Sequence, residues 1–372
     1  MKQCLYITQS YDEQIVNKNI FKILDDLQIQ NEINPQMNVV IKPNLILPKS
    51  PNVSCTTHPQ VIKAVALWLK EKGIKNITLA ESSGGPYLKE YMMQVYKACK
   101  VYDLQDVLKL NDDFSSVTVH TREGFKNRTY NIIAPITKAD YIINICKLKT
   151  HSMTMQSAGI KNLFGVIPGL EKPQLHYRWP NINDFANMIV ELAQTVSPQL
   201  TIIDAIDSME GNGPTGGSVK HTGLLLGSKD MYTQDYFAAT LMKLDPCKVE
   251  ILMNAKQKGL IHIEDMQLVG DEVPNDLTPF KIPDSKDLNF SNFFLPGAIG
   301  KAFAKIAATV LKSYPKLISE KCVGCGKCAE SCPQKIITIK NNKAIFPKKN
   351  CISCFCCQEM CPLKAITVKK AL

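Results

Sequence analysis

The sequence CVGCGKCAESCP at residues 322–333 decides the fold of the C-terminal part of this chain, and CISCFCCQEMCP at residues 351–362 repeats its pattern. Both runs have the spacing C-x2-C-x2-C-x3-C-P. Thiolates spaced in this way can surround a [4Fe-4S] cube, because three of them bind three irons of one cluster. Two matching runs predict two [4Fe-4S] clusters, and therefore a chain that carries electrons. Zinc sites and disulfides are the alternatives, but two copies of one spacing with the same proline argue against them.

The fourth cysteine of each run is expected to bind the cluster of the other run. The proline that follows it turns the chain away, so that its sulfur reaches the second cube. Cys356 lies beside a predicted ligand but outside the pattern, and we expect a packed thiol rather than a ninth ligand. The two predicted ligand sets are Cys322, Cys325, Cys328 and Cys361, and Cys351, Cys354, Cys357 and Cys332.

The two runs belong to a longer internal repeat. CPQKIITIK at residues 332–340 aligns with CPLKAITVK at residues 361–369 without a gap. Each copy passes from a cysteine loop into a β-branched segment, and a turn at Asn341-Asn342 allows Ala344 to Phe346 to pair back as a strand. From about Leu317 onward, the segment resembles the bacterial two-cluster ferredoxin family over its whole length. The resemblance implies a small α+β ferredoxin-like domain that transfers electrons at low potential.

The positive charge of the chain is concentrated in this segment. Eleven lysines and three glutamates fall within residues 316–372, which gives +8 of the net +10 of all 372 residues. A positive electron-transfer surface predicts an acidic partner, and an acidic ferredoxin or flavodoxin is the expected electron donor. The alternative is a solvated lysine-rich surface without a partner. Nucleic acid is not expected, because the basic residues are not interleaved with stacking aromatics.

Localisation and domain boundaries follow from composition. We expect a cytoplasmic protein, because the N-terminal residues lack the pattern of a secretory signal and the scattered, odd-numbered cysteines are typical of reduced intracellular thiols. The apolar stretch from Phe293 to Leu311 contains Pro296, Lys301 and Lys305, so no membrane span is expected. We expect a linker helix that docks on its own protein, with a membrane surface as the alternative. The predicted divisions are residues 1–290, 291–315 for the linker helix, and 316–372.

The N-terminal part alternates β-branched apolar runs with helical patterns, which predicts a large α/β domain with a mainly parallel sheet. Prolines between Val273 and Phe294 predict an irregular extension toward the linker. Expected strands are Leu5 to Thr8, Val39 to Ile41, Ile77 to Ala80, Tyr141 to Ile145, Leu200 to Ile203 and Leu224 to Leu226. Expected helices are Glu13 to Leu27, Pro59 to Glu71, Leu88 to Cys99, Ile182 to Thr195 and Gln234 to Leu244.

Polar residues cluster after these strands, where open α/β sheets bind ligands. Lysines and glycine amides from separate loops predict a positive pocket for a carboxylate or phosphate. His151 is the candidate proton donor, because its ordinary pKa suits neutral pH. Ordinary βα turns with solvated lysines, and a hydrogen-bonded loop histidine, are the alternatives. The candidate substrate-binding residues are Lys42, Asn44, Lys147, Lys149, Lys161, Asn162, Glu210, Asn212 and Gly213.

One glycine pattern does not predict a nucleotide site. Residues 211–216 match G-x-G-x-x-G, but Asp207 to Glu210 are expected to separate the pattern from its strand. Ser218 to Leu226 also has the pattern of a strand, whereas a dinucleotide fingerprint requires a helix there. We therefore expect no Rossmann site.

Four of these motifs carry a second resemblance. KPN at residues 42–44, KLKTH at 147–151, KNLFG at 161–165 and EGNGPTG at 210–216 resemble the domain-of-unknown-function 362 (DUF362) family of iron-sulfur-centre proteins. The resemblance covers about residues 35 to 275, and members often carry the same ferredoxin tail. It implies a single site but no particular reaction.

Two functions remain open from the sequence. The first is a ferredoxin-dependent reductase that passes low-potential electrons through two clusters to an anionic small molecule in the N-terminal domain. The second is a non-catalytic electron-delivery module that docks a separate enzyme. Phosphate-group or ligase chemistry with structural clusters is a third alternative. A pocket near a cluster favours the enzyme, whereas a flat apolar patch favours the docking module.

Overall fold

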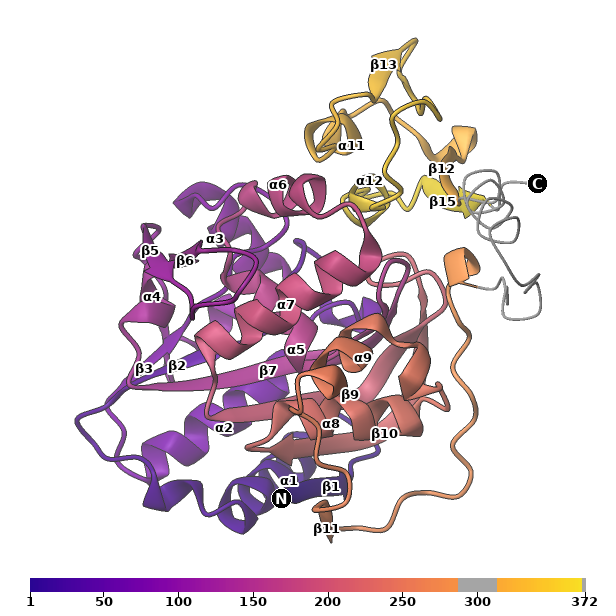
Figure 1. The fold of residues 1–372 in the computed structure, drawn as a ribbon. Helices are drawn as coiled ribbons and strands as arrows, with labels where there is room; N and C mark the ends of the chain where they lie inside the picture. Colours follow the sequence, from indigo (N-terminus) through magenta and orange to yellow (C-terminus); the bar gives the residue numbers. More distant parts are fainter. Residues whose placement is uncertain (287–312, 370–372) are drawn as a thin grey trace.

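The computed structural model describes residues 1–286 and 313–369 (Figure 1). Its N-terminal part is built on a nine-stranded sheet with the order β11-β1-β10-β9-β7-β2-β3-β4, and β8 pairs with β7. The neighbours from β9 to β4 are all parallel, whereas β10 and β8 run against them. The predicted mainly parallel α/β domain is therefore confirmed.

The strands of this sheet include every expected one. A separate antiparallel pair, β5 and β6, was not predicted. The bounds are β1 Lys2–Ile7, β2 Asn38–Lys42, β3 Asn76–Leu79, β4 Lys109–Leu110, β5 Ser116–His120, β6 Thr129–Ile133, β7 Tyr141–His151, β8 Met155–Ser157, β9 Leu200–Glu210, β10 Ser218–Ser228 and β11 Gln267–Gly270.

Helices cover both faces of the sheet, and Figure 1 shows α7, α8 and α9 in front of it. The alternation of side chains along β2 explains the two layers: Val39 and Ile41 pack in a core with α1, α2 and α3, whereas Val40 packs in a core with α7 and α9. The bounds are α1 Glu13–Asp26, α2 Pro59–Glu71, α3 Lys89–Ala98, α4 Ala134–Thr137, α5 Gly159–Asn162, α6 Glu171–Arg178, α7 Ile182–Val196, α8 Met231–Leu241 and α9 Glu250–Gln257.

Two strands are longer than predicted, and both changes affect the candidate site. β7 continues through His151, so the lysines expected in a loop project from a strand that pairs with β8 and β9. β9 continues to Glu210 because it pairs with β10 as far as Ser218. The expected loop between β9 and the glycine pattern is therefore wrong, but the expected strand after the pattern is present as β10.

The C-terminal part forms a small domain of short elements, which we call the cluster domain (residues 313–369). The strand β12 pairs antiparallel with β15, and β13 pairs with β14 in a hairpin. Asn341 and Asn342 both have positive φ in the hairpin turn, as the predicted two-residue turn requires. The bounds are β12 Tyr314–Leu317, α11 Lys327–Glu330, β13 Thr338–Lys340, β14 Lys343–Ile345, α12 Cys356–Glu359 and β15 Ile366–Lys369.

The connection between the two parts is described only at its start. Residues 273–286 form an extension whose only helical turn is Asp284–Lys286. The predicted linker helix lies outside the described residues. Within residues 1–286 and 313–369, no helix has both the length and the apolar character that crossing a bilayer requires.

Candidate functional site

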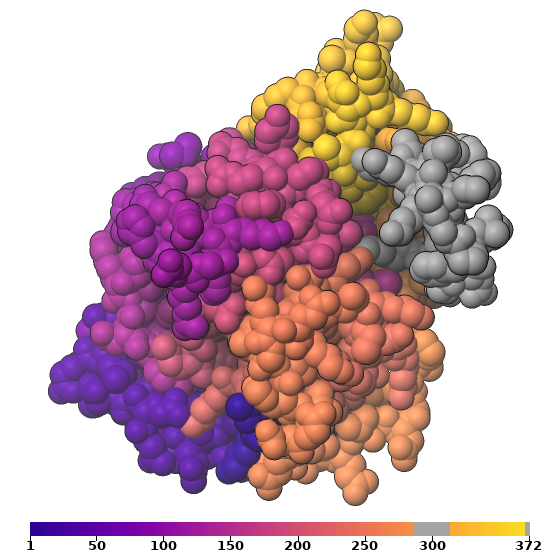
Figure 2. Space-filling model, in the orientation of Figure 1, coloured from indigo at the N-terminus to yellow at the C-terminus, as the bar shows by residue number. Residues whose placement is uncertain are grey.

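A cavity of about 80 Å³ lies where the cluster domain covers the carboxyl edge of the sheet. Figure 2 shows the cluster domain, in yellow, directly against the N-terminal part. Hydrogen bonds hold the two together: Thr215 Oγ1 donates to the Glu359 carbonyl oxygen at 3.0 Å, and Lys364 Nζ donates to the Gly217 carbonyl oxygen at 3.3 Å. The lining includes Asn44, Lys149, His151, Lys161, Asn162, Lys172 and His176 from the N-terminal part, and Ser331, Cys356, Glu359 and Met360 from the cluster domain.

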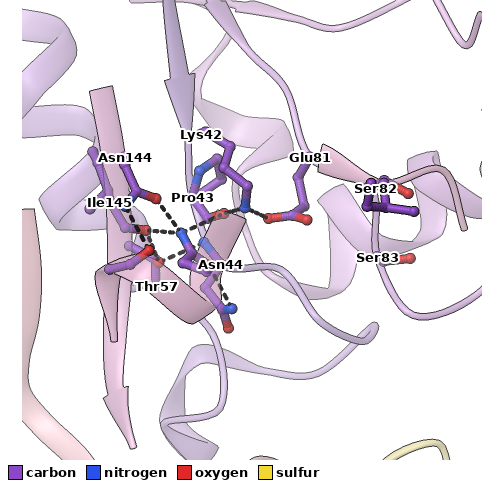
Figure 3. Close-up of polar contacts among 12 residues, drawn as sticks. Lys42, Pro43, Asn44, Thr57, Glu81, Ser82, Ser83, Asn144 and Ile145 are labelled. Atoms are coloured by element: carbon purple, nitrogen blue, oxygen red, sulfur yellow. Dashed lines mark hydrogen bonds and ion pairs between the residues drawn. The ribbon is translucent and has the colours of Figure 1, made fainter. Parts of the chain in front are cut away.

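A chain of amides forms one wall of this cavity, and Figure 3 labels two of its members, Asn44 and Asn144. Lys149 Nζ donates to Asn44 Oδ1 and to the Cys55 carbonyl oxygen, both at 2.8 Å. Asn44 Nδ2 donates to Asn162 Oδ1, and Asn162 Nδ2 donates to Asn144 Oδ1, again at 2.8 Å. Burial lowers the pKa of Lys149 to about 8. The KPN, KLKTH and KNLFG motifs are thus joined in one hydrogen-bonded wall, as the single-site prediction expects.

Two of the predicted lysines form buried ion pairs and do not line the cavity, although Glu81, the partner of one of them, does. Lys42 Nζ lies 2.6 Å from Glu81 Oε2, and Lys147 Nζ lies 2.8 Å from Asp204 Oδ2. All four side chains are at most 3% exposed. These two ammonium groups therefore organise the edge of the sheet, and they are not free to bind an anion.

The Lys42–Glu81 pair provides a stability prediction. Lys42→Met leaves the Glu81 carboxylate buried without its partner, so we expect the free energy of unfolding to fall by about 3–5 kcal/mol. Adding Glu81→Gln removes the orphaned charge and should restore most of that loss. Lys63→Met is the control, since the Lys63–Glu13 pair is exposed and contributes about 0–1 kcal/mol. Denaturant unfolding followed by tryptophan fluorescence measures all three, and a loss for Lys42→Met no larger than the control would contradict the assignment.

His151 has an orientation that suits proton donation into the cavity. Its Nδ1 accepts from the backbone N–H groups of Met153 at 3.1 Å and Thr154 at 3.3 Å. In the neutral ring the proton therefore resides on Nε2. That nitrogen lies 3.4 Å from Oε1 of Glu359, which belongs to the cluster domain.

Lys161 is the predicted lysine that remains open toward the cavity. Among the described residues, no hydrogen bond or ion pair involves its ammonium group, which lies 4.9 Å from the Phe164 ring centroid. Its side chain is only partly buried, yet the surrounding protein lowers the pKa of Lys161 by desolvation, and the Glu359 carboxylate opposes that shift. An ammonium group without a partner in a closed-over site is suited to a ligand anion.

Sequence reasoning missed several residues of the cavity. Lys172 donates to carbonyl oxygens of Ser82, Ser83 and Ile167, and burial lowers its pKa to about 7. His176 is buried and stacks on Phe185, and desolvation lowers its pKa to about 3, so the ring is neutral. Both residues follow the KNLFG motif on α6, a helix with no expected role.

Glu359 and Cys356 were also missed, because they belong to the cluster domain. Glu359 is not a predicted ligand, and Cys356 was expected only to pack. Both side chains line the cavity. A side-chain hydrogen bond with Cys354 and burial both raise the pKa of the Cys356 thiol, so it is protonated at neutral pH.

Three predicted site residues lie elsewhere. Glu210 accepts from the Lys281 backbone N–H, and Asn212 exchanges hydrogen bonds with Asp284. The Gly213 carbonyl oxygen accepts from the backbone and hydroxyl of Ser152. The glycine-rich loop thus anchors the extension toward the cluster domain, and only its Pro214 lines the cavity.

The predicted cluster ligands surround two further cavities. Cys322, Cys325, Cys328 and Cys361 line one, and Cys332, Cys351, Cys354 and Cys357 line the other. In each cavity, the first three cysteines of one run therefore lie with the fourth cysteine of the other run, which is the predicted arrangement. Among the described residues, no three His, Cys, Asp or Glu side chains converge closely enough for a single metal ion. The ferredoxin spacing of the two runs fits polynuclear clusters better than zinc ions.

Comparisons with known proteins agree with both parts of the molecule. Residues 39–240 match the family model described as Domain of unknown function (DUF362), and residues 314–362 match that of a 4Fe-4S dicluster domain. The second match supports iron-sulfur clusters and a role in electron transfer. A relative from Synechocystis sp., the thylakoid-associated protein sll1697, is 30% identical over 261 residues, which cover 68% of this chain and 78% of the relative.

One solved structure is distantly similar. The lactate racemase apoprotein from Thermoanaerobacterium thermosaccharolyticum aligns with a TM-score of 0.41 and 10% sequence identity. The alignment covers 65% of this chain and 57% of that protein, so the chain spans less than two thirds of its length.

Proposed function

The chain belongs to the DUF362 family and carries a 4Fe-4S dicluster domain; from this we propose that it is a ferredoxin-dependent reductase of a small anionic molecule. The observation that carries the proposal is the shared cavity. Residues of the DUF362 part and residues of the cluster domain line the same cavity, and a substrate in it would contact both.

The cavity adjoins one of the two cysteine sets. Ser331 and Cys356 line the cavity, while their neighbours Cys332 and Cys357 line the cysteine pocket formed with Cys351 and Cys354. Consecutive residues of the chain therefore line the two cavities at two points. When bound, two [4Fe-4S] clusters would supply single electrons at low potential. The set of Cys332, Cys351, Cys354 and Cys357 would hold the cluster next to the substrate.

The other cysteine set faces outward, which suits an electron donor. Its cavity is lined by Val323, which is 63% exposed, and by the exposed Cys325. Lys321 and Lys327 lie beside them. An apolar centre with lysines around it favours an acidic ferredoxin or flavodoxin as the donor, because opposite charge speeds encounter.

In this proposal, each residue of the cavity has a role that its contacts support. Lys161 binds the anionic group, since its ammonium contacts the Phe164 and Phe185 rings but makes no hydrogen bond or ion pair among the described residues. Lys149, Asn44 and Asn162 form the rigid wall, and His151 donates a proton from Nε2. The cluster domain excludes water by covering the opening. The non-catalytic docking module remains the alternative, but it does not require a cavity with an open ammonium group between the two parts of the chain.

Reduced protein provides the test of this function. We expect that a small anion from a metabolite panel will reoxidise the anaerobically reduced, cluster-loaded protein, seen as recovery of the visible absorbance. His151→Gln should slow that reoxidation by about 10²–10⁴-fold, because proton donation is lost. His120→Gln is the matched control, since His120 lies on the separate β5–β6 hairpin. Reoxidation by no member of the panel would refute the reductase.

A further inference from the structure

The cavity contains two opposite charges that do not pair with each other. Lys161 and Glu359 both line it, and each is among the charged groups that shift the pKa of the other. Yet no ion pair joins them within the described residues. Glu359 Oε1 is buried and accepts no hydrogen bond from the described part of the chain, although His151 Nε2 lies 3.4 Å away. A buried oxygen without a hydrogen bond is costly, so these two groups define the ends of a ligand site.

The other cations of the cavity are already bound to protein oxygens. Lys149 donates to Asn44 and Cys55, and Lys172 donates to three backbone carbonyls. Because Lys161 alone is open among the described lysines that line the cavity, the cavity offers one full cationic contact. A carboxylate matches that single contact, whereas a phosphate dianion carries more negative charge than one ammonium group balances.

The size of the cavity limits the ligand further. A volume of about 80 Å³ provides room for roughly five to eight water positions. The ligand is therefore expected to have a similar number of non-hydrogen atoms. The neutral His176, whose Nδ1 makes no hydrogen bond to any residue that the structure describes, provides a further polar contact on the side of α6.

From this arrangement we propose that the cavity binds a small carboxylate that carries an O–H or N–H group on the adjoining carbon. Its carboxylate contacts Lys161, and its hydrogen-bond donor contacts Glu359 Oε1. Glu359 thereby makes the cluster domain part of the binding site and sets its specificity. This inference rests on the proposed function, since it assigns a substrate class to the same cavity.

Calorimetric titration of the oxidised, cluster-loaded protein tests the proposal without electron transfer. The probes are glycolate and glycine, which carry a donor beside the carboxylate, together with acetate, which lacks one, and inorganic phosphate. We expect glycolate or glycine to bind at least about tenfold more tightly than acetate, because a hydrogen bond to a charged group is gained. Equal affinity for acetate, stronger binding of phosphate, or no binding of any carboxylate would overturn the proposal.

Variants of Glu359 test whether this side chain causes the tighter binding of glycolate or glycine over acetate. Glu359→Met should reduce the preference over acetate to about twofold or less, while acetate binds as well as before or better, since a negative charge is removed. Glu359→Gln keeps a carbonyl oxygen at this position, and it provides a second variant to measure if Glu359→Met does not fold. Glu320→Gln, at an exposed position of the same domain, is the control. Retained discrimination in a folded Glu359→Met protein, with full iron content, would refute the role of Glu359.

The failures of the two proposals can be told apart. If glycolate or glycine binds with the expected preference but no carboxylate reoxidises the reduced protein, the reductase function fails and the ligand class stands. If other anions reoxidise the protein while these carboxylates do not bind, the ligand class fails and the reductase function stands.

Discussion

Replacing Cys332 with serine is expected to reduce the iron content from about eight to about four atoms per chain, through loss of the cluster held by the other run. Cys332 follows Cys328 in sequence, but it lines the cavity of Cys351, Cys354 and Cys357. Serine oxygen is a poor ligand for this type of cluster, although weak ligation can leave part of the iron bound. Iron analysis together with electron paramagnetic resonance of the reduced protein measures the loss and identifies the remaining cluster.

Cys356→Ser is the matched control for this experiment. Cys356 neighbours Cys357 but lines the interdomain cavity instead of the cysteine pocket, so its replacement should leave the iron content unchanged. A loss of about four irons from Cys356→Ser, with full retention in Cys332→Ser, would contradict the exchange of ligands between the two runs. It would also place Cys356 among the ligands, which both the spacing and the cavities argue against.

Lys161→Met is expected to stabilise the protein while it weakens ligand binding. The ammonium group of Lys161 is desolvated and has no hydrogen bond or ion pair within the described residues, so its removal should raise the free energy of unfolding by roughly 1 kcal/mol. The affinity for a bound carboxylate should fall by about ten- to a hundredfold, because a charge-assisted hydrogen bond is lost. Denaturant unfolding and calorimetric titration measure the two effects.

The opposite effect on the free energy of unfolding is expected when Lys149 is replaced. Lys149→Met leaves Asn44 Oδ1 and the Cys55 carbonyl oxygen without their donor, so stability should fall by about 1–3 kcal/mol. If Lys161→Met destabilises the protein as much as Lys149→Met does, then Lys161 has a structural partner. Unchanged ligand affinity in Lys161→Met would remove this residue from the binding site.

The local patterns of this chain predict its elements and its cluster ligands. Apolar periodicity and helix caps place α2 at Pro59–Glu71, as the structure has it, and the cysteine spacing predicts the partition of eight thiols that the two cavities show. Strand ends were harder to predict. β7 and β9 continue past their apolar runs, because their polar ends pair with β8 and β10, and such pairing partners are not evident in the strand itself.

The sequence by itself determined the two-part organisation, the parallel sheet and the sites of the thiols, because each depends on spacing and periodicity within short segments. Only the tertiary structure decided which charges are available to a ligand. Four lysines belong to the KPN, KLKTH and KNLFG motifs, and the sequence does not distinguish their roles. In the structure, Lys42 and Lys147 form ion pairs with Glu81 and Asp204, whereas Lys161 forms none with any described residue. Glu359 joins the site solely because the cluster domain packs over the sheet edge, and the contacts between distant segments that place it there have no signature in local sequence.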